Sequence, residues 1–136
     1  DKSAEELKIS VGSAVAVNNE NKAEVRGRDF LTGLPRTIEI STNQIVAAID
    51  DELRQIVKAV RDVFQETPPE LAADIIDQGI IMTGGTSQLN NLPELIYRKT
   101  GVKAYLADKP LYCVVNGTGI ALEHLDTYKK SVISKR

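Results

Sequence analysis

The chain has 136 residues, 42% of them hydrophobic and 26% charged, a composition typical of a globular protein with one sizeable core. The net charge of −2 and the few aromatic residues, four Tyr and two Phe without Trp, argue against a nucleic-acid-binding protein. The single cysteine, Cys113, excludes a disulfide within the chain and fits a reducing cytosol. No apolar stretch approaches the ~20 residues of a membrane span. Because the chain opens at Asp1 inside an apparent helix, we expect it to be a piece of a longer protein.

The first forty residues predict a helix followed by a β-hairpin. Residues 3–9, "SAEELKI", are typical of a helix that Ser3 caps and that Gly12 ends. Residues 22–29 and 36–41 alternate apolar and polar side chains and are separated by turn residues. They therefore predict two antiparallel strands with one buried face.

The middle of the chain predicts further helices. A long helix begins after Ser41, Thr42 or Asn43, any of which can cap it, and its apolar residues recur at steps of three and four. One stripe of this helix should therefore face a core. The acidic run at residues 50–52 can start a second helix, so we allow a bend there. The prolines at 68–69 end this helix and begin a short one.

The second half alternates strands and helices. Residues 79–82, "GIIM", predict a strand with no polar face, as expected in a sheet covered on both sides. A helix over residues 93–100 is closed by Gly101, a strand follows at 102–107, and a helix is predicted over 108–126. This order predicts a doubly wound α/β element, the type built on a parallel sheet.

A double glycine stands where the first of these strands ends. Residues 83–86 read "TGGT", which matches neither the GxGxxG nor the GxxxxGK[ST] phosphate-binding pattern. Paired glycines can simply serve a tight turn. They can also let a ligand approach the main chain, since ligands of α/β folds bind at the carboxyl ends of strands. Taken alone, the turn is weak evidence for a site.

Four segments carry a more specific signal: "SAEELKISVGSA", "VRGRDFLTGLPRTIEI", "TPPELAADIIDQGIIMTGG" and "ADKPLYCVVNGTGIALEHLD". Together they resemble the C-terminal part of MreB, the bacterial actin homologue that shapes rod cells, from about Lys2 to Asp126. The resemblance implies an α/β chain forming part of an actin-like ATPase (ribonuclease H-like) fold. It implies that residues 1–50 form most of a small outer subdomain, residues 51–126 the C-terminal part of an inner subdomain, and residues 127–136 a basic tail.

The resemblance further implies an adenosine site between the first helix and the glycine turn. Glu5 and Lys8 would hold the ribose and adenine from one side, since a carboxylate accepts hydrogen bonds and a lysine stem covers an aromatic face. The other side would be lined by Gly84, Gly85, Thr86, Ser87 and Gln88. Thr86 stands where the family commonly has a third glycine, which bears on how closely a nucleotide approaches. The simpler alternative for Glu5 and Lys8 is a surface ion pair.

ATP, with Mg²⁺ in the full-length protein, is the cofactor that the resemblance implies. The phosphate-binding and catalytic segments of that superfamily would precede residue 1, so we expect no catalytic or metal-binding residue here and no ATP hydrolysis by this chain alone.

Cys113 and His124 are eleven residues apart on one predicted helix, about 16 Å along its axis, which excludes a Cys–His dyad. Cys113 is expected to be a small buried side chain. Gly117 and Gly119 in that helix predict close packing, or nearness to the phosphate cleft.

The loop of the hairpin has an apolar tip with a basic rim. Phe30, Leu31 and Leu34 lie beside Arg28 and Arg36. Such a tip suits a subunit contact or a membrane contact, unless it folds back onto its own subdomain. The resemblance implies that this subdomain helps to form the head-to-tail contact of a filament.

The last ten residues contain Lys129, Lys130, Lys135 and Arg136. Periodicity is lost there, so we expect a frayed, solvated tail. Weak attraction to an anionic membrane surface is the alternative.

The resemblance thus implies a cytoskeletal protein that binds ATP and polymerises into filaments at the inner face of the cell membrane, where it determines cell shape. Its partners would be further copies of itself, the inner membrane surface, and cell-shape or motility proteins, with no nucleic acid. One alternative is another actin-fold ATPase, an Hsp70-like chaperone or a sugar kinase. The other is a small α/β module that binds a partner and no nucleotide.

Overall fold

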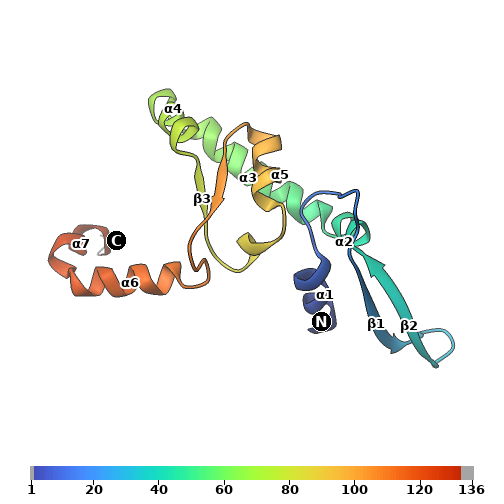
Figure 1. Ribbon diagram of the computed structural model, residues 1–136. Coiled ribbons are helices and arrows are strands. Elements are labelled where there is room, and N and C mark those ends of the chain that lie inside the picture. Colours follow the sequence, from blue (N-terminus) through green and yellow to red (C-terminus); the bar gives the residue numbers. More distant parts are fainter. Residues whose placement is uncertain (1, 133–136) are drawn as a thin grey trace.

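The computed structural model describes residues 2–132 as an elongated α/β chain (Figure 1). The elements in order are α1 (Lys2–Val11), β1 (Lys22–Arg28), β2 (Pro35–Ser41), α2 (Thr42–Ala48), α3 (Asp50–Glu66), α4 (Pro69–Gln78), β3 (Ile80–Met82), the 3₁₀ turn η1 (Thr86–Gln88), α5 (Leu92–Thr100), β4 (Ala104–Leu106), α6 (Cys113–Glu123) and α7 (Leu125–Val132). The hairpin lies at one end of the elongated molecule, and α6 and α7 lie at the other end.

Helix α1 is longer than the sequence predicts at its start. It already includes Lys2, so Ser3 lies inside the helix and is not its N-cap. Lys2 is a good helix former, so the helix can include it. The end of the helix is as predicted, because α1 stops at Val11, directly before Gly12, whose N–H makes the last helical hydrogen bond to the Lys8 carbonyl at 3.0 Å.

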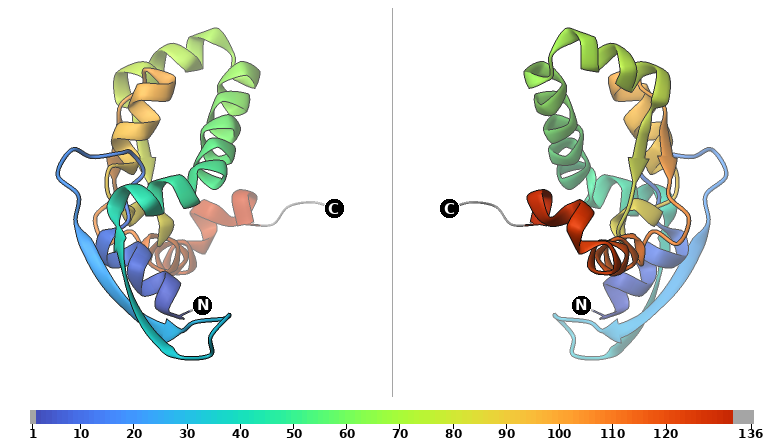
Figure 2. Two further views of the ribbon diagram at one scale, coloured as in Figure 1. Left: turned by 90° about the vertical axis from the view of Figure 1, so that its right-hand side faces the viewer. Right: turned by 90° about the vertical axis from the view of Figure 1, so that its left-hand side faces the viewer.

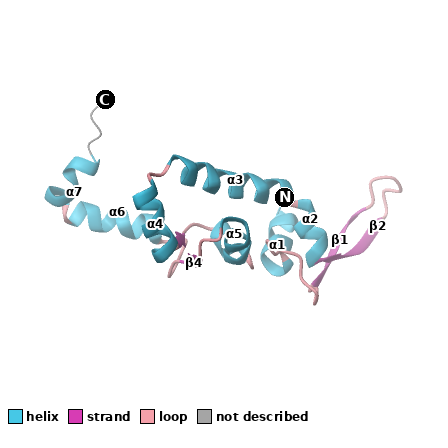
Figure 3. Ribbon diagram, turned by 90° about the horizontal axis from the view of Figure 1, so that it is seen from above, coloured by secondary structure: helices cyan, strands magenta, loops and turns pink. Residues whose placement is uncertain are grey.

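The hairpin of β1 and β2 pairs in the register that brings its apolar residues to one face. Ala23 lies opposite Ile40, and Val25 lies opposite Ile38. Figure 3 shows α1 and α2 beside the base of the hairpin, while its outer part projects away from them. Ile38 is therefore still 43% exposed, so the face predicted to be buried is covered only in part.

Ser41 is the residue that caps the helix after the hairpin. Its hydroxyl accepts a hydrogen bond from the Gln44 N–H, and the Gln44 side chain accepts one from the Ser41 N–H. The predicted bend is confirmed: α2 ends at Ala48, and Ile49 leaves helical geometry before Asp50 begins α3. The turned views show α3 running from α2 to α4, with α5 and the strands on the other side (Figure 2).

The core lies where α3 meets α5 and the loop after α1. Its buried side chains are Ala14, Leu53, Val57, Leu92, Leu95 and Ile96. The apolar stripe predicted for the long helix supplies two of these residues from α3. The Arg61 guanidinium of α3 also donates to the Lys99 carbonyl of α5, with Nε 3.1 Å from that oxygen.

Strands β3 and β4 pair in parallel, as the alternation of strands and helices predicts. Ile80 and Met82 pack against the core, but Ile81 is 70% exposed. The prediction that this sheet is covered on both sides is therefore wrong for this chain, because the two strands have a core-forming layer on one side.

The last predicted helix is shorter than expected. It begins at Cys113, because residues 108–112 form a turn in which Lys109 has φ 48° and the Tyr112 N–H donates to the Lys109 carbonyl. Proline disfavours helical geometry at the residue before it, here Lys109, and the Pro110 carbonyl accepts a hydrogen bond from the Gly84 N–H at 2.9 Å.

Helix α6 projects from the rest of the chain. A Cβ at Gly117 or Gly119 would meet nothing within 4 Å, so the predicted close packing is not found within residues 2–132.

After α6 the chain continues as α7 to Val132, and the prediction of a frayed tail is wrong up to that residue. Over the same described range, no helix has the length and apolar character needed to cross a bilayer.

The core makes a direct stability prediction. Ile96, on α5, is 2% exposed and its replacement by Ala should lower the free energy of unfolding by about 2–5 kcal/mol. Ile76→Ala on α4, at a side chain 61% exposed, is the matched control and should cost less than about 1 kcal/mol. Urea unfolding measures both, and equal losses would contradict this placement of the core.

Candidate functional site

A cavity of about 430 Å³ lies between α1 and the loop that leads from β3 into α5. These two segments lie beside each other in Figure 1, although they are far apart in the sequence. The cavity is lined by Glu5, Lys8, Ile9, Gly85, Thr86, Gln88, Leu89, Asn90 and Leu111. It is therefore bordered by both segments from which the sequence predicts a site.

Helix α1 forms the first wall. Glu5 and Lys8 are one turn apart and so lie on one side of the helix, where both side chains are exposed. Among the described residues, the ion pair on this helix joins Lys2 and Glu6, with Nζ 4.0 Å from Oε1. The alternative in which Glu5 pairs with Lys8 is thus not seen, and both side chains border the cavity.

The loop from β3 into α5 forms the second wall. Gly84 and Ser87 stabilise the turn in this loop but do not line the cavity. Gly84 has φ 88°, a left-handed conformation that strains residues with a Cβ. Its N–H donates to the Pro110 carbonyl, and its carbonyl accepts a hydrogen bond from the Ser87 hydroxyl at 2.6 Å. Ser87 is 6% exposed, so both residues have a structural role here.

Gly85 differs from Gly84, because its backbone does not require glycine. Its φ of −63° and ψ of −44° are right-handed helical values open to any residue. A Cβ there would lie at ordinary contact distance, 3.4 Å, from Leu111 Cδ2. Gly85 and Leu111 both border the cavity, so the missing side chain leaves bare main chain on the cavity wall.

Thr86 and Gln88 complete the polar part of the second wall. They belong to η1, and both have exposed side chains that border the cavity. A hydroxyl and an amide can each donate and accept hydrogen bonds, so this wall can contact the polar edge of a ligand.

Four residues of the cavity were not predicted from the sequence. Ile9 follows Lys8 directly, and Leu89 and Asn90 follow Gln88, so an extension of each segment by one or two residues would have included them. Leu111 could not be found in this way. It reaches the cavity because residues 108–112 form a turn, where the sequence predicts helix.

A larger and mainly apolar cavity of about 550 Å³ lies on another side of α1, against β2 and α2. It is lined by Ala4, Glu5, Leu7, Lys8, Ile40, Gln44, Ile45, Ala48 and Ile49. Glu5 and Lys8 border both cavities, but the glycine turn borders the smaller one alone.

The hairpin tip is the second feature of functional interest. Phe30 and Leu31 are 99% and 91% exposed, so this apolar tip does not fold back onto its subdomain. Asp29 orders the loop, because its Oδ1 accepts hydrogen bonds from the N–H groups of Leu31 and Thr32 and from the Thr32 hydroxyl. The Thr32 N–H, and then Arg36, hold the pKa of the Asp29 carboxyl below its ordinary value. The tip is thus a fixed apolar projection.

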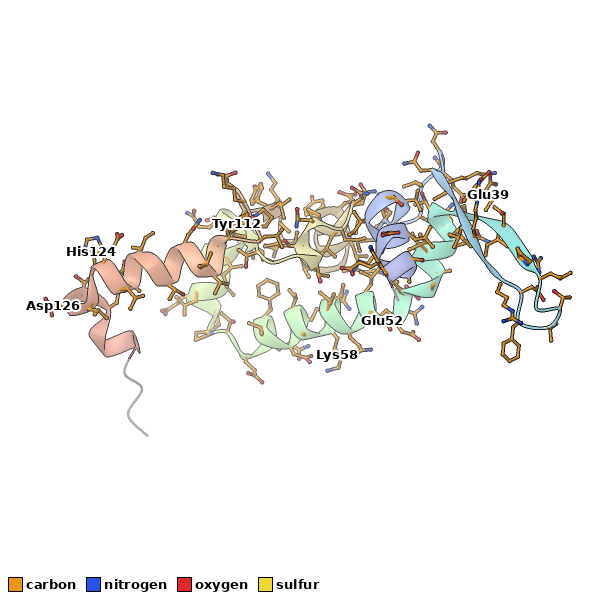
Figure 4. All side chains as sticks on the ribbon, turned by 90° about the horizontal axis from the view of Figure 1, so that it is seen from below. Glu39, Glu52, Lys58, Tyr112, His124 and Asp126 are labelled. Atoms are coloured by element: carbon orange, nitrogen blue, oxygen red, sulfur yellow. The ribbon has the colours of Figure 1, made fainter. Side chains whose placement is uncertain are left out.

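The remaining predicted residues lie away from the cavity. Figure 4 shows Tyr112 where α6 leaves the body and His124 at the far end of that helix. Cys113 follows Tyr112 and is half-buried, with Sγ 3.6 Å from the Asp108 and Lys109 carbonyl oxygens. No group of three or more His, Cys, Asp or Glu that could hold a metal occurs in the part of the chain that the structure describes. Lys135 and Arg136 lie outside the described residues, as do the side chains of Lys129 and Lys130.

Comparison with known proteins gives one consistent result. The family described as MreB/Mbl protein matches residues 1–130. Cell shape-determining protein Mbl of Bacillus cereus is 40% identical over 133 residues, which cover 98% of this chain and 40% of that protein. Cell shape-determining protein MreB of Escherichia coli is 39% identical over 132 residues, covering 97% of this chain and 38% of that protein.

Solved structures agree with the sequence relatives. MreB5 of Spiroplasma citri bound to ADP matches with a TM-score of 0.85 and 32% identity, over 91% of this chain and 38% of that one. The AMPPNP-bound form matches with a TM-score of 0.85 and 30% identity, over 97% and 40%. The predicted fold class, part of an actin-like α/β fold, is confirmed. The chain spans about two fifths of the length of the curated relatives it matches.

The two glycines should respond differently to substitution. Gly84→Ala forces a Cβ into a left-handed conformation and should lower the free energy of unfolding by about 1–2 kcal/mol. Gly85→Ala should leave that free energy unchanged or raise it by up to about 1 kcal/mol, because alanine restricts the unfolded chain. Thermal unfolding of both variants measures the contrast, and an equal loss would show that both glycines serve the turn alone.

Proposed function

This chain belongs to the MreB/Mbl protein family, and we propose that in its natural full length it is a cell shape-determining filament protein that binds ATP. The proposal assigns two roles to the described residues. The cavity between α1 and the glycine turn receives the adenosine part of the nucleotide, and the hairpin tip contacts a neighbouring subunit.

The cavity is suited to the first role, binding of the adenosine part of the nucleotide. Its volume of about 430 Å³ lies within the roughly 300–1,000 Å³ usual for small-molecule sites. Ile9, Leu89 and Leu111 supply apolar contacts for a purine, and the bare main chain at Gly85 lets a flat ring approach closely. Glu5 can accept hydrogen bonds from ribose hydroxyls, and the Lys8 stem can lie along the base with its ammonium group in water.

The solved relatives support a nucleotide as the occupant. MreB5 of Spiroplasma citri, which has the same fold over nearly all of this chain, is described as bound to ADP and to AMPPNP. We propose ATP with Mg²⁺ as the cofactor. Mg²⁺ and the phosphate-binding segments would supply charge stabilisation at the phosphates, while this chain binds and orients the nucleoside.

The hairpin tip is suited to the second role, contact with a neighbouring subunit. Phe30 and Leu31 project on a loop that Asp29 holds in one conformation, so a partner meets an ordered surface. An apolar projection that fits a different surface of the next copy generates an open, head-to-tail filament when the rotation between copies does not close a ring. The relatives' names connect the family with cell shape, and we place such filaments at the cytoplasmic face of the cell membrane. The membrane surface and other cell-shape or motility proteins are the further partners of this proposal.

Membership of the MreB/Mbl family sets aside the Hsp70-like chaperone and the sugar kinase. A partner-binding module without nucleotide is the remaining competitor. Calorimetry with ATP and Mg²⁺ on the protein in its natural full length decides between the two, because such a module gives no binding heat.

The adenosine role predicts the effect of removing each polar side chain of α1. Glu5→Ala should weaken ATP binding by about tenfold or more, since hydrogen bonds to charged groups contribute about 1.5–3 kcal/mol. Lys8→Ala should also weaken it, because the apolar stem that covers the base is lost, at about 0.8 kcal/mol per buried CH₂ group. The controls are Lys2→Ala and Glu6→Ala, which remove the same two side-chain types from the same helix but do not border the cavity. Calorimetry gives the affinities, and equal effects at all four positions would refute the assignment.

The filament role predicts a separate defect. The double variant Phe30→Ser, Leu31→Ser should reduce assembly in the presence of ATP, seen by electron microscopy and sedimentation, while its affinity for ATP stays unchanged. Ile76→Ser on α4, also at an exposed apolar residue, is the control. Normal filaments from the double variant would show that the tip is not a subunit contact.

A further inference from the structure

The two walls of the cavity are joined at one end by a partly buried polar contact, here called the clasp, between the buried residues 12–14 and the exposed Asn90 and Asn91. The Ala14 N–H donates to the Asn90 carbonyl at 2.7 Å. The Asn90 side-chain Nδ2 donates to the Gly12 carbonyl at 2.9 Å, and the Asn91 Nδ2 donates to the Ser13 hydroxyl oxygen at 3.0 Å. Three hydrogen bonds thus connect segments 78 positions apart in the sequence.

The clasp has little freedom to change its geometry. Ser13 is 2% exposed, and its hydroxyl is engaged a second time by donating to the Val15 carbonyl at 2.7 Å. Asn91 is held at φ 60°, a left-handed conformation that few residues other than glycine adopt. A Cβ on Gly12 would overlap the Lys8 carbonyl oxygen, so this position has no room for a side chain.

Each half of the clasp is rigidly connected to one wall. On one side, the Gly12 N–H is bonded to the carbonyl of Lys8, which borders the cavity. On the other side, Asn90 borders the cavity itself and follows Gln88 by two residues. Asn91 starts α5, whose Leu92 is 4% exposed in the core.

We propose that the clasp sets the separation of the two cavity walls, with Asn90 and Asn91 as positioning residues for the nucleoside. This inference rests on the proposed nucleotide binding. Without the clasp, α1 would remain attached to the hairpin and α2, while the glycine turn would remain attached to the core through Leu89. Ala14 would still anchor the loop after α1 in the core, so the walls would shift rather than part. A purine would then lose part of its contact with one wall, because van der Waals attraction falls steeply over less than 1 Å.

Asn90→Ala and Asn91→Gly test this inference in the protein in its natural full length. Asn91→Gly removes the amide but accepts the left-handed backbone, so it separates the lost hydrogen bond from strain. Each variant should bind ATP about three- to tenfold more weakly, as expected when a positioning hydrogen bond is lost. Affinity for inorganic triphosphate, which has no nucleoside to reach this cavity, should not change.

Asn43→Ala is the matched control. Asn43 also joins distant segments through one side chain, because its Nδ2 donates to the Val17 carbonyl at 3.0 Å and its Oδ1 accepts from the Val17 N–H at 3.0 Å. It does not border the cavity. Asn43→Ala removes two side-chain hydrogen bonds, against one in Asn90→Ala, so it should lower the unfolding temperature at least as much and leave ATP affinity unchanged.

The outcomes are distinct. Weaker ATP binding in both clasp variants, with triphosphate affinity retained and Asn43→Ala unaffected, supports the inference. Unchanged ATP affinity in the clasp variants, or equal loss for ATP and triphosphate, overturns it while the proposed function stands. A wild-type protein that binds no ATP overturns the proposed function, and the inference fails with it.

Discussion

The position of α1 against the glycine turn is the constraint on which the functional account depends. Those segments come from opposite halves of the chain and meet through partly buried hydrogen bonds that join Gly12, Ser13 and Ala14, all buried, to Asn90 and Asn91. Because buried polar groups left unpaired are costly, these contacts favour one register of helix against turn. That register places the exposed charges of the helix opposite the uncovered main chain at Gly85.

The elements of local origin could be predicted from the sequence. The apolar stripe of α3 and the cap at Ser41 follow from periodicity or capping chemistry within a few residues, and the parallel β3–β4 pair follows from the alternation of strands and helices along the chain. The turn at residues 108–112 could be predicted only in part. Pro110 disfavours helical geometry at Lys109, which is a local signal, but no local pattern reveals the hydrogen bond from the Gly84 N–H to the Pro110 carbonyl.

The candidate site likewise combines residues that could be predicted from the sequence with residues that only the tertiary structure reveals. Glu5, Lys8 and Gly85 were expected from the family resemblance, and the structure places them around one cavity; that they bind adenosine stays a prediction. Ser87 was expected to line the site but supports the turn instead, since a hydroxyl next to a carbonyl oxygen can satisfy the backbone as readily as a ligand. Leu111 was missed because it reaches the cavity by way of the unpredicted turn. Side-chain type thus predicts which residues can serve a site, whereas long-range contacts decide which of them do.

The central claim is that adenosine lies between α1 and the glycine turn. A structure of the protein in its natural full length, bound to a non-hydrolysable ATP analogue, tests this most directly. The account predicts a purine ring packed between the Lys8 stem and the main chain of Gly85, with the ribose next to Glu5. A bound nucleotide whose base lies elsewhere, with that cavity filled by solvent or by other side chains, would contradict it.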